Sequence, residues 1–151
     1  MADVLTPQQR SFNMSRIRSR DTRPEMIVRS IAHRMGFRYR LHKKDLPGKP
    51  DLVFVRQRKI IDVHGCFFHM HNCQYGRVKP ATNAEFWQTK RESNRKRDRR
   101  NSRLLKEAGW DVLIIWECQT RSVASVEKTI ADFLSADTIP RAHRERREVN
   151  C

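Results

Sequence analysis

Two aspartates and a histidine lie in two short apolar segments, 51–55 and 59–64, whose composition is typical of a β-hairpin. If the hairpin is symmetric about its turn, Asp51 lies opposite His64 and diagonal to Asp62, with all three side chains on one face. Diagonal Cβ atoms in such a pair are ~7–8 Å apart, so the two carboxylates can share one hard cation with oxygen ligands at ~2.1 Å. The hairpin predicts a divalent-metal centre, although two aspartates can also occupy these positions without a metal.

The same residues match a nuclease pattern. Pro50-Asp51 followed by Asp62-Val63-His64 resembles the signature PD…(D/E)xK of metal-dependent nucleases, with His64 in place of the lysine. Aspartates are poor strand formers, so two of them in one hairpin need a reason. The pattern indicates phosphodiester chemistry, but it rests on few positions.

A second group of residues has the composition of a zinc site. Cys66, His71 and Cys73 fall within eight residues, and Cys118 follows the apolar segment that ends at Trp116. Three thiolates and one imidazole suit tetrahedral Zn²⁺ in a closed, structural site. Because no secretory leader is apparent, we expect a reducing cytoplasm in which thiols persist. Buried free thiols are the alternative.

His69 and Asp98 are candidates for proton transfer. His69 lies between two proposed metal ligands, and a loop fixed on both sides would hold its imidazole in one direction, as a general base requires. Asp98 lies among arginines, which keep it ionised at neutral pH, so it could orient a histidine or pair with a nearby arginine. For His69 the alternative is an exposed side chain without a catalytic role.

The charge of the chain points to a nucleic acid. Its 151 residues include 32 Lys and Arg against 17 Asp and Glu, a formal net charge of +15, which favours a polyanionic partner. No run approaches the ~20 apolar residues of a membrane span. Phe67, Phe68 and Trp87 are candidates for insertion between bases, with core packing as the alternative. The basic side chains expected to contact DNA are Arg16, Arg18, Lys90, Arg91, Arg95 and Arg99.

Capping signals and periodicity predict the elements that position these residues. Thr22-Arg-Pro-Glu25 and Thr82-Asn-Ala-Glu85 both match a capping box, so we expect one helix that ends at Gly36 and a second that ends near Ala108. The hairpin turn is predicted at 56–59. The order of elements indicates a mixed sheet covered by helices. The remaining predicted elements are strands at 37–41, 51–55, 59–64 and 112–116 and a helix at 125–135.

Three segments of the chain differ in composition. Residues 1–20 form a basic arm expected to contact DNA, residues 21–136 form the nuclease domain, and residues 137–151 form a basic tail. Cys151 lies in this tail and is not expected to bind a metal.

Taken together, these residues resemble the very-short-patch repair endonuclease family. The resemblance covers roughly residues 1–135 and rests most on the His-Gly-Cys-Phe block with the distant Trp-Glu-Cys. The motifs that carry it are Leu46-Pro-Gly-Lys-Pro-Asp51, His64-Gly-Cys-Phe-Phe-His69, His71-x-Cys73, Glu85-Phe-Trp87, Asn94-Arg-Lys-Arg-Asp98 and Gly109-Trp-Asp-Val-Leu-Ile-Ile-Trp-Glu-Cys118.

The resemblance implies a fold and an activity. The fold is a three-layer α/β/α, restriction-endonuclease-like (PD-(D/E)xK) arrangement with a mixed central sheet and a structural zinc site. The activity is an Mg²⁺-dependent nick on the 5′ side of the thymine in a T:G mismatch, such as arises when 5-methylcytosine deaminates. The resemblance also implies a monomer that acts on double-stranded DNA in the prokaryotic cytoplasm, at the nucleoid, with mismatch-repair proteins as candidate partners.

By match to family positions, Asp51 is the central ligand of the catalytic metal, expected as two Mg²⁺ ions, with help from the backbone carbonyl of Val63. His64 faces the scissile phosphate. Glu25 binds a metal-bound water, with its capping box as a competing explanation. Asp62 departs from the better-known members, which have an apolar residue there; an acid restores the broader nuclease pattern and predicts stronger metal binding.

The resemblance also assigns the remaining site residues. His69 is the candidate general base, with Asp98 behind it. Phe68 stands where the family commonly has Trp, which predicts weaker stacking at that position. The structural zinc ligands are Cys66, His71, Cys73 and Cys118. The aromatic wedge beside the mismatch is Phe67, Phe68 and Trp87.

Two other functions fit parts of the sequence. One is a restriction-type nuclease that cleaves both strands of undamaged DNA. The other is a zinc-stabilised DNA-binding module without catalysis. The clustered acids argue against the binding module, because carboxylates repel phosphate unless a metal lies between them.

Overall fold

The computed structural model describes Gln8 and residues 21–136. The predicted tail 137–151 and, apart from Gln8, the predicted arm 1–20 lie outside these residues, and so do Arg16, Arg18 and Cys151. The elements in chain order are α2 (Arg23–Arg34), β1 (Arg40–Leu41), β2 (Leu52–Phe54), β3 (Lys59–His64), α3 (Ala84–Glu107), β4 (Asp111–Trp116), the short 3₁₀ helix η1 (Glu117–Arg121) and α4 (Val123–Ser135).

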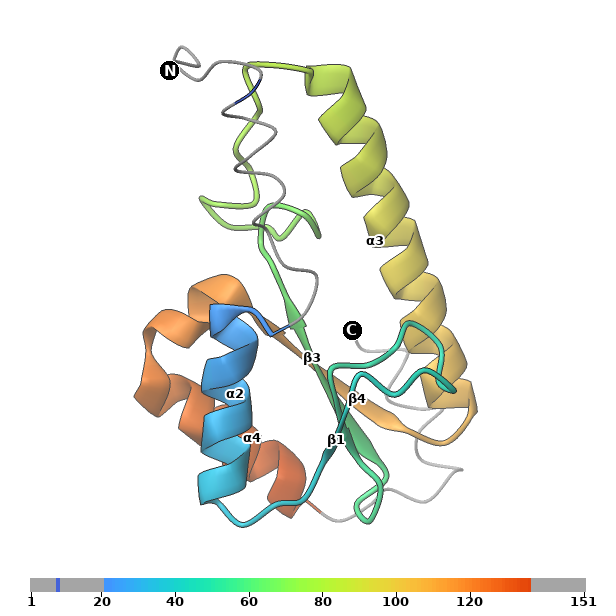
Figure 1. Ribbon diagram of the computed structural model, residues 1–151, viewed down its shortest axis with the longest axis vertical. Coiled ribbons are helices and arrows are strands. Elements are labelled where there is room, and N and C mark those ends of the chain that lie inside the picture. The colour runs from blue at the N-terminus through green and yellow to red at the C-terminus, as the bar shows by residue number, and fades with distance from the viewer. Residues whose placement is uncertain (1–7, 9–20, 137–151) are drawn as a thin grey trace.

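The four strands form one mixed sheet in the order β1-β2-β3-β4 (Figure 1). β1 and β2 pair antiparallel, β2 and β3 pair antiparallel, and β3 and β4 pair parallel. A parallel pair needs a crossover, and α3 supplies it. β3 and β4 therefore end at the same edge of the sheet, so the residues that follow His64 and Trp116 meet there. The predicted mixed sheet is confirmed.

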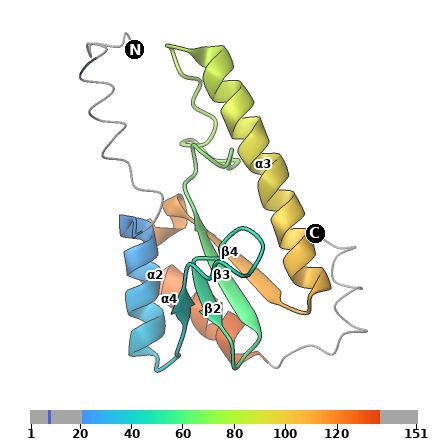
Figure 2. The same ribbon diagram turned by 45° about the vertical axis from the view of Figure 1, so that its right-hand side comes forward.

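Helices cover both faces of this sheet (Figures 1 and 2). On one face Val28 of α2 and Ile130 of α4 belong to the same buried cluster as Ile61 of β3. On the other face Leu105 of α3 packs in a smaller cluster with Ile60, since successive strand residues point to opposite faces. The N-terminal half of α3 extends beyond the sheet together with the loop 65–83. No helix among the described residues is long and apolar enough to cross a bilayer.

The helix ends match the capping predictions in part. Thr22 caps α2, because its hydroxyl accepts a hydrogen bond from the amide of Glu25 at 3.4 Å. The α2 helix ends just before Gly36, which has a φ of 87° that suits glycine. The capping box predicted at the start of α3 is wrong, because the N-cap is Asn83, with a φ of 54° and no side-chain hydrogen bond to the helix.

The register predicted for the hairpin is wrong by two residues. The turn occupies 55–58 rather than 56–59, and one further step along the observed register places Asp51 opposite Asp62 instead of opposite His64. A shift of two residues keeps every side chain on its predicted face. The observed pairs are Leu52 with Ile61, Val53 with Ile60 and Phe54 with Lys59.

The burial of Lys59 explains this difference. Its charge suggests a turn residue, but only 1% of the residue is exposed. Its ammonium group donates hydrogen bonds of 2.5 Å to the carbonyls of Phe133 and Ala136, at the C-terminal end of α4. A cation is favourable there because the last carbonyls of a helix carry partial negative charge. Lys59 is therefore the first residue of β3.

Candidate active site and metal-binding loop

Asp51 lies at the start of β2, between two neighbouring strands. Its carbonyl accepts a hydrogen bond from the amide of His42 at 3.1 Å, next to β1. Its amide donates to the carboxylate of Asp62 at 3.0 Å, and its own carboxylate accepts from the amide of Val63 at 2.8 Å. The two aspartates thus hold each other's backbone segments, and the structure brings them together as the hairpin predicted.

The two carboxylates are in an environment that opposes negative charge. Burial, followed by repulsion from Asp62, raises the pKa of Asp51 to about 8. Burial raises the pKa of Asp62 to about 6. A divalent cation would offset both effects, and carboxylate oxygens are the ligands that hard cations prefer. The donor set at Asp51 therefore fits Mg²⁺.

Glu25 is buried beside this centre. Its carboxylate lies 3.1 Å from Nε2 of His42 and 3.3 Å from the guanidinium of Arg29, and His42 Nε2 is 3.9 Å from the carboxylate of Asp51. Only the Thr22 half of the capping box is therefore used. The Glu25 carboxylate instead points to the two carboxylates of Asp51 and Asp62, here called the acidic centre. His42 could not be identified from the sequence, because it is 17 residues from Glu25 and no periodic pattern links them.

The raised pKa of Asp51 predicts a pH-dependent stability. The folded state holds this proton up to about pH 8, whereas the unfolded chain releases it near its ordinary pKa of 3.8. Stability is therefore lost as pH rises from about 4 to 8. Without added divalent cation, Asp51→Asn should raise the Tm by roughly 3–6 °C at pH 8 and by less at pH 5, measured by scanning fluorimetry.

The exposed Asp45 offers a matched control. Its pKa is lowered, chiefly by its hydrogen bond to Lys43, so Asp45→Asn should give no increase in Tm. An Asp51→Asn variant that gains no more stability at pH 8 than at pH 5 would contradict the prediction.

His69 and Asp98 form a hydrogen-bonded pair between the Nδ1 atom and the carboxylate, as predicted. With Nδ1 held by a carboxylate, the Nε2 atom of His69 is left to accept a proton. The ring of His64 stacks on His69 with centroids 4.1 Å apart. Burial lowers the pKa of His64 to about 4, so its imidazole is neutral at pH 7. Asp98 and His69 also shift the pKa of Asp62, which places the pair beside the acidic centre.

His64, His69 and Asp98 offer ligand atoms within 4.8 Å of one another. The two imidazole rings are nearly parallel, with an interplanar angle of 13°. Nitrogen lone pairs lie in the ring plane, so the lone pairs of two stacked rings converge poorly on one ion. The geometry fits proton transfer better than metal binding.

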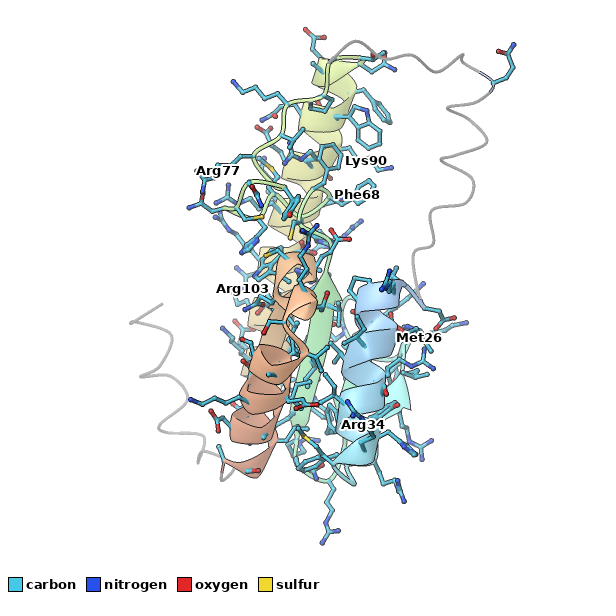
Figure 3. The ribbon with its side chains drawn as sticks, turned by 90° about the vertical axis from the view of Figure 1, so that its left-hand side faces the viewer. Met26, Arg34, Phe68, Arg77, Lys90 and Arg103 are labelled. Atoms are coloured by element: carbon cyan, nitrogen blue, oxygen red, sulfur yellow. The ribbon has the colours of Figure 1, made fainter. Side chains whose placement is uncertain are left out.

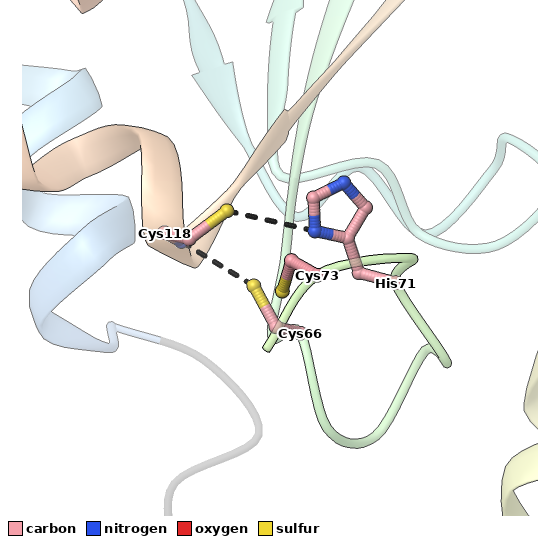
Figure 4. A group of neighbouring side chains, drawn as sticks. All are labelled: Cys66, His71, Cys73 and Cys118. Atoms are coloured by element: carbon pink, nitrogen blue, oxygen red, sulfur yellow. Dashed lines mark hydrogen bonds between the residues drawn. The ribbon is translucent and has the colours of Figure 1, made fainter. Parts of the chain in front are cut away.

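The four predicted zinc ligands converge at the shared edge of β3 and β4 (Figure 4). Each of Cys66, His71, Cys73 and Cys118 offers one ligand atom, and these atoms lie within 4.8 Å of one another. The Sγ atom of Cys118 is 3.5 Å from Nδ1 of His71. The Cys118 amide donates to Cys66 Sγ at 3.3 Å, and the Gly76 amide donates to Cys73 Sγ at 3.4 Å.

These four side chains fit a site for a borderline-soft cation better than they fit a group of free thiols without a metal. Burial raises the pKa of Cys66 to about 12, so a cation is needed to hold it as a thiolate at neutral pH. Three sulfur atoms and one imidazole nitrogen match tetrahedral Zn²⁺. Because Cys66 follows β3 and Cys118 follows β4, such an ion would tie the loop 65–83 to the sheet.

The three candidate wedge residues form an aromatic cluster, defined here as Phe67, Phe68 and Trp87. Their ring centroids are 5.3 to 6.0 Å apart, and all three rings are half-buried, outside both buried cores. Phe86, which the sequence reasoning missed, is 57% exposed and packs on Trp87. Figure 3 shows Phe68 and Lys90 at the same end of the molecule. This end therefore presents aromatic rings and a positive charge.

Arg91 is not placed to contact DNA, contrary to prediction. Only 5% of it is exposed, because its guanidinium donates to the carbonyls of Phe67 at 2.7 Å, Val78 at 3.3 Å and Gly76. The loop 65–83 has carbonyls that need donors, and a planar guanidinium can serve several at once. The other predicted contacts on α3, which are exposed, are Lys90, Arg95 and Arg99.

Comparisons with known proteins agree with this geometry. The family model described as DNA mismatch endonuclease Vsr matches residues 2–75. The type II nicking enzyme V.XorIIP of Xanthomonas oryzae pv. oryzae is 42% identical over 134 residues, which are 89% of this chain and 98% of the relative. The DNA mismatch endonuclease Vsr of Escherichia coli is 46% identical over 121 residues, which are 80% of this chain and 77% of the relative.

A third relative, the type II nicking enzyme V.NmeAIP of Neisseria meningitidis, is 39% identical over 124 residues, which are 82% of this chain and 88% of the relative. These matches extend across the sheet, the metal-binding loop and α3. They imply the restriction-endonuclease-like fold, in line with the mixed sheet described above. The chain belongs to the very-short-patch repair endonuclease family and is a DNA endonuclease.

Proposed function

We propose that this endonuclease nicks one strand of double-stranded DNA on the 5′ side of the thymine in a T:G mismatch. The observation that carries the proposal is the placement of the His69–Asp98 pair beside the carboxylates of Asp51 and Asp62, with His69 directly after the two phenylalanines of the aromatic cluster. Hydrolysis needs the His69–Asp98 pair and the acidic centre. The aromatic cluster can insert beside a mismatch, which is easier to unstack than a matched pair. The likeness to a DNA mismatch endonuclease supports the same substrate.

The acidic centre is proposed to hold the catalytic metal. Asp51 is the central ligand, with Asp62 and the backbone carbonyl of Val63 beside it, and Glu25 orients a water molecule next to them. Two Mg²⁺ ions, when bound there, would supply neutralisation of the charge that develops on the attacking and leaving oxygens. The paired backbone hydrogen bonds between Asp51 and the 62–63 segment fix the carboxylates before any substrate binds.

The histidines are proposed to act on the water and the phosphate. Nε2 of His69 accepts the proton of the attacking water, while Asp98 fixes the ring through Nδ1. His64, neutral at pH 7, donates a hydrogen bond from its one ring N–H to an oxygen of the scissile phosphate and adds no charge. In-line attack of the water oxygen forms a new P–O bond and breaks the P–O3′ bond; the 3′-oxygen takes up a proton from solvent, which gives a 3′-hydroxyl and a 5′-phosphate.

The remaining parts support binding. We propose that Zn²⁺ at Cys66, His71, Cys73 and Cys118 has a structural role. The exposed side chains of Lys90, Arg95 and Arg99 on α3 neutralise phosphates, which makes the affinity for DNA dependent on salt. Because a T:G mismatch is asymmetric, the protein acts as a monomer, in the bacterial cytoplasm at the nucleoid, with mismatch-repair proteins as candidate partners.

A nicking assay tests this function. Duplexes that differ only at one position, T:G, T:A or C:G, are incubated with the protein and Mg²⁺, and each strand carries a different label. We expect a single cut in the thymine strand of the T:G duplex and none in the others. Cleavage of both strands of the matched duplexes would instead identify a restriction-type nuclease. Binding without cleavage of any duplex would identify a binding module.

Removal of the Trp87 ring is expected to weaken binding to the T:G duplex more than binding to matched DNA, so that the preference for the mismatch falls. Stacking on a base contributes about 1–3 kcal/mol, so Trp87→Ala should weaken binding to the T:G duplex by about tenfold or more. Binding to the matched C:G duplex should fall less than about threefold, as measured by fluorescence anisotropy. The variant Trp87→Phe, which keeps a ring, should retain most of the preference. Equal losses on both duplexes would show that Trp87 does not read the mismatch.

A further inference from the structure

Three consecutive loop residues are held by three residues on one face of α3. The loop residues are Phe67, Phe68 and His69, and the helix residues that contact them, in the same order, are Arg91, Asn94 and Asp98. The helix residues are spaced by three and four, so they share a face of α3. The candidate general base His69 and the backbone of both phenylalanines are thus bound to the same helix.

Arg91 makes the most extensive of these contacts. Its Nε donates to the carbonyl of Phe67 at 2.7 Å, its other nitrogens donate to the carbonyls of Gly76 and Val78, and its guanidinium lies over the Phe67 ring at 4.4 Å. A Cβ atom on Gly76 would be 1.9 Å from the carbonyl oxygen of His71, so the loop is tightly folded at the point where Arg91 donates a hydrogen bond to it. Arg91 therefore holds together two parts of the loop 65–83, the backbone at Phe67 and the backbone at Gly76 and Val78.

Asn94 and Asp98 continue the same contact. The side-chain amide of Asn94 donates to the carbonyl of Phe68 at 3.1 Å, and Asp98 binds the ring of His69. One turn before Arg91, Trp87 supplies the third ring of the aromatic cluster. The aromatic cluster and the candidate base consequently have a common support.

We propose that Arg91 and Asn94 are positioning residues that couple the aromatic cluster to His69, so that insertion of the rings sets the distance from the base to the scissile phosphate. This inference rests on the proposed function. Stacked bases resist the insertion of the aromatic rings, and this resistance would displace the loop 65–83 if a single contact held it. Because Arg91 and Asn94 of α3 hold the carbonyls of Phe67 and Phe68, the loop is not displaced on insertion, and His69 keeps its position. A displacement of about 1 Å at a reacting centre can cost 100-fold in rate.

The coupling is tested by separating insertion from cleavage. A T:G duplex carries 2-aminopurine beside the mismatch, and its fluorescence rises when the base unstacks. The test variants are Asn94→Ala, which removes a single hydrogen bond, and Arg91→Lys, which keeps the charge but cannot serve three carbonyls at once. The matched control is Arg34→Met, an exposed arginine at the far end of α2 (Figure 3).

We expect both test variants to retain the fluorescence rise within about twofold and the Kd for the T:G duplex within about threefold. Their single-turnover nicking rate at saturating protein should fall by about tenfold or more. The midpoint of the pH–rate profile should stay unchanged, because His69 and Asp98 are intact. Arg34→Met should match the wild type in every measurement.

Other results would overturn the inference. Nicking at the wild-type rate in both variants would show that the contacts position nothing. Proportional losses of affinity and rate in Arg91→Lys would make Arg91 a DNA contact, and a rate that falls only with the folded, zinc-loaded fraction would make both residues purely structural. If the wild-type protein itself neither nicks the T:G duplex nor raises the fluorescence, the proposed function fails first, and the inference with it.

Discussion

Asp51→Asn is expected to reduce the rate of nicking of a T:G duplex in Mg²⁺ by at least about 1,000-fold, with little effect on DNA binding. Loss of one preorganised electrostatic group at a reacting centre typically has an effect of this size. Asn keeps the shape of the side chain, but a neutral amide cannot complete the charged donor set beside Asp62 and Glu25. Quenched-flow measurement of the single-turnover rate, with anisotropy for binding, would separate the two effects.

Two comparisons make this result specific. Asp45→Asn, at a side chain that is 68% exposed, should nick at the wild-type rate. Asp62→Asn should lose less than Asp51→Asn, about tenfold, because Asp51 is the proposed central metal ligand and Asp62 a flanking one, while each Asn can keep the backbone hydrogen bond of the carboxylate it replaces. The Tm of Asp51→Asn, measured in the nicking buffer with Mg²⁺, should stay well above the assay temperature, so that unfolding does not account for its loss of activity. A variant that nicks normally would remove Asp51 from the catalytic centre.

The second large effect is expected at the proposed zinc site of Cys66, His71, Cys73 and Cys118. Cys118→Ser should lose its bound zinc, measured as zinc per chain by mass spectrometry, and its Tm should fall by about 10 °C or more. Metal binding at a closed site contributes directly to folding free energy, and the remaining three ligands would leave a buried site incomplete. The loss should be large here because Cys118 joins the end of β4 to the loop after β3.

The chain offers a matched control for this change. Cys151→Ser makes the same replacement at the one cysteine not assigned to the site, and it should keep one zinc per chain and the wild-type Tm. A Cys118→Ser protein with full zinc and an unchanged Tm would exclude the proposed donor set. A Tm that falls while zinc stays bound would instead assign Cys118 to packing alone.

Local signals predicted the elements well where the cause of the element is local. Thr22 caps α2 and Gly36 follows its end, because both effects depend on a few neighbouring backbone groups. The short apolar segment after the turn identified β3, and the spacing of Cys66, His71 and Cys73 identified three of the four residues of the cysteine–histidine cluster. These features can be recognised without knowledge of the tertiary structure.

The errors arise where a charged side chain is buried by a distant segment. The sequence predicts Lys59 at the end of the hairpin turn and Arg91 on the DNA-contacting surface, because charged side chains are mostly exposed. Lys59 is buried because the end of α4, more than 70 residues later, needs a donor, and Arg91 is buried because the loop 65–83 does. His42 was missed for the same reason, since its place beside Asp51 depends on the pairing of β1 with β2. Sequence periodicity carries no information on such partners.

The parallel pairing of β3 with β4 has a consequence for the protein while it is being made. Asp51 and His69 emerge early from the ribosome, but β3 has no partner on one side until 111–116 are synthesised, and the fourth residue of the cysteine–histidine cluster arrives only with Cys118. A nascent or prematurely terminated chain thus has the residues of the nuclease without the scaffold that aligns them. Alignment of the nuclease residues therefore requires translation through β4 and Cys118.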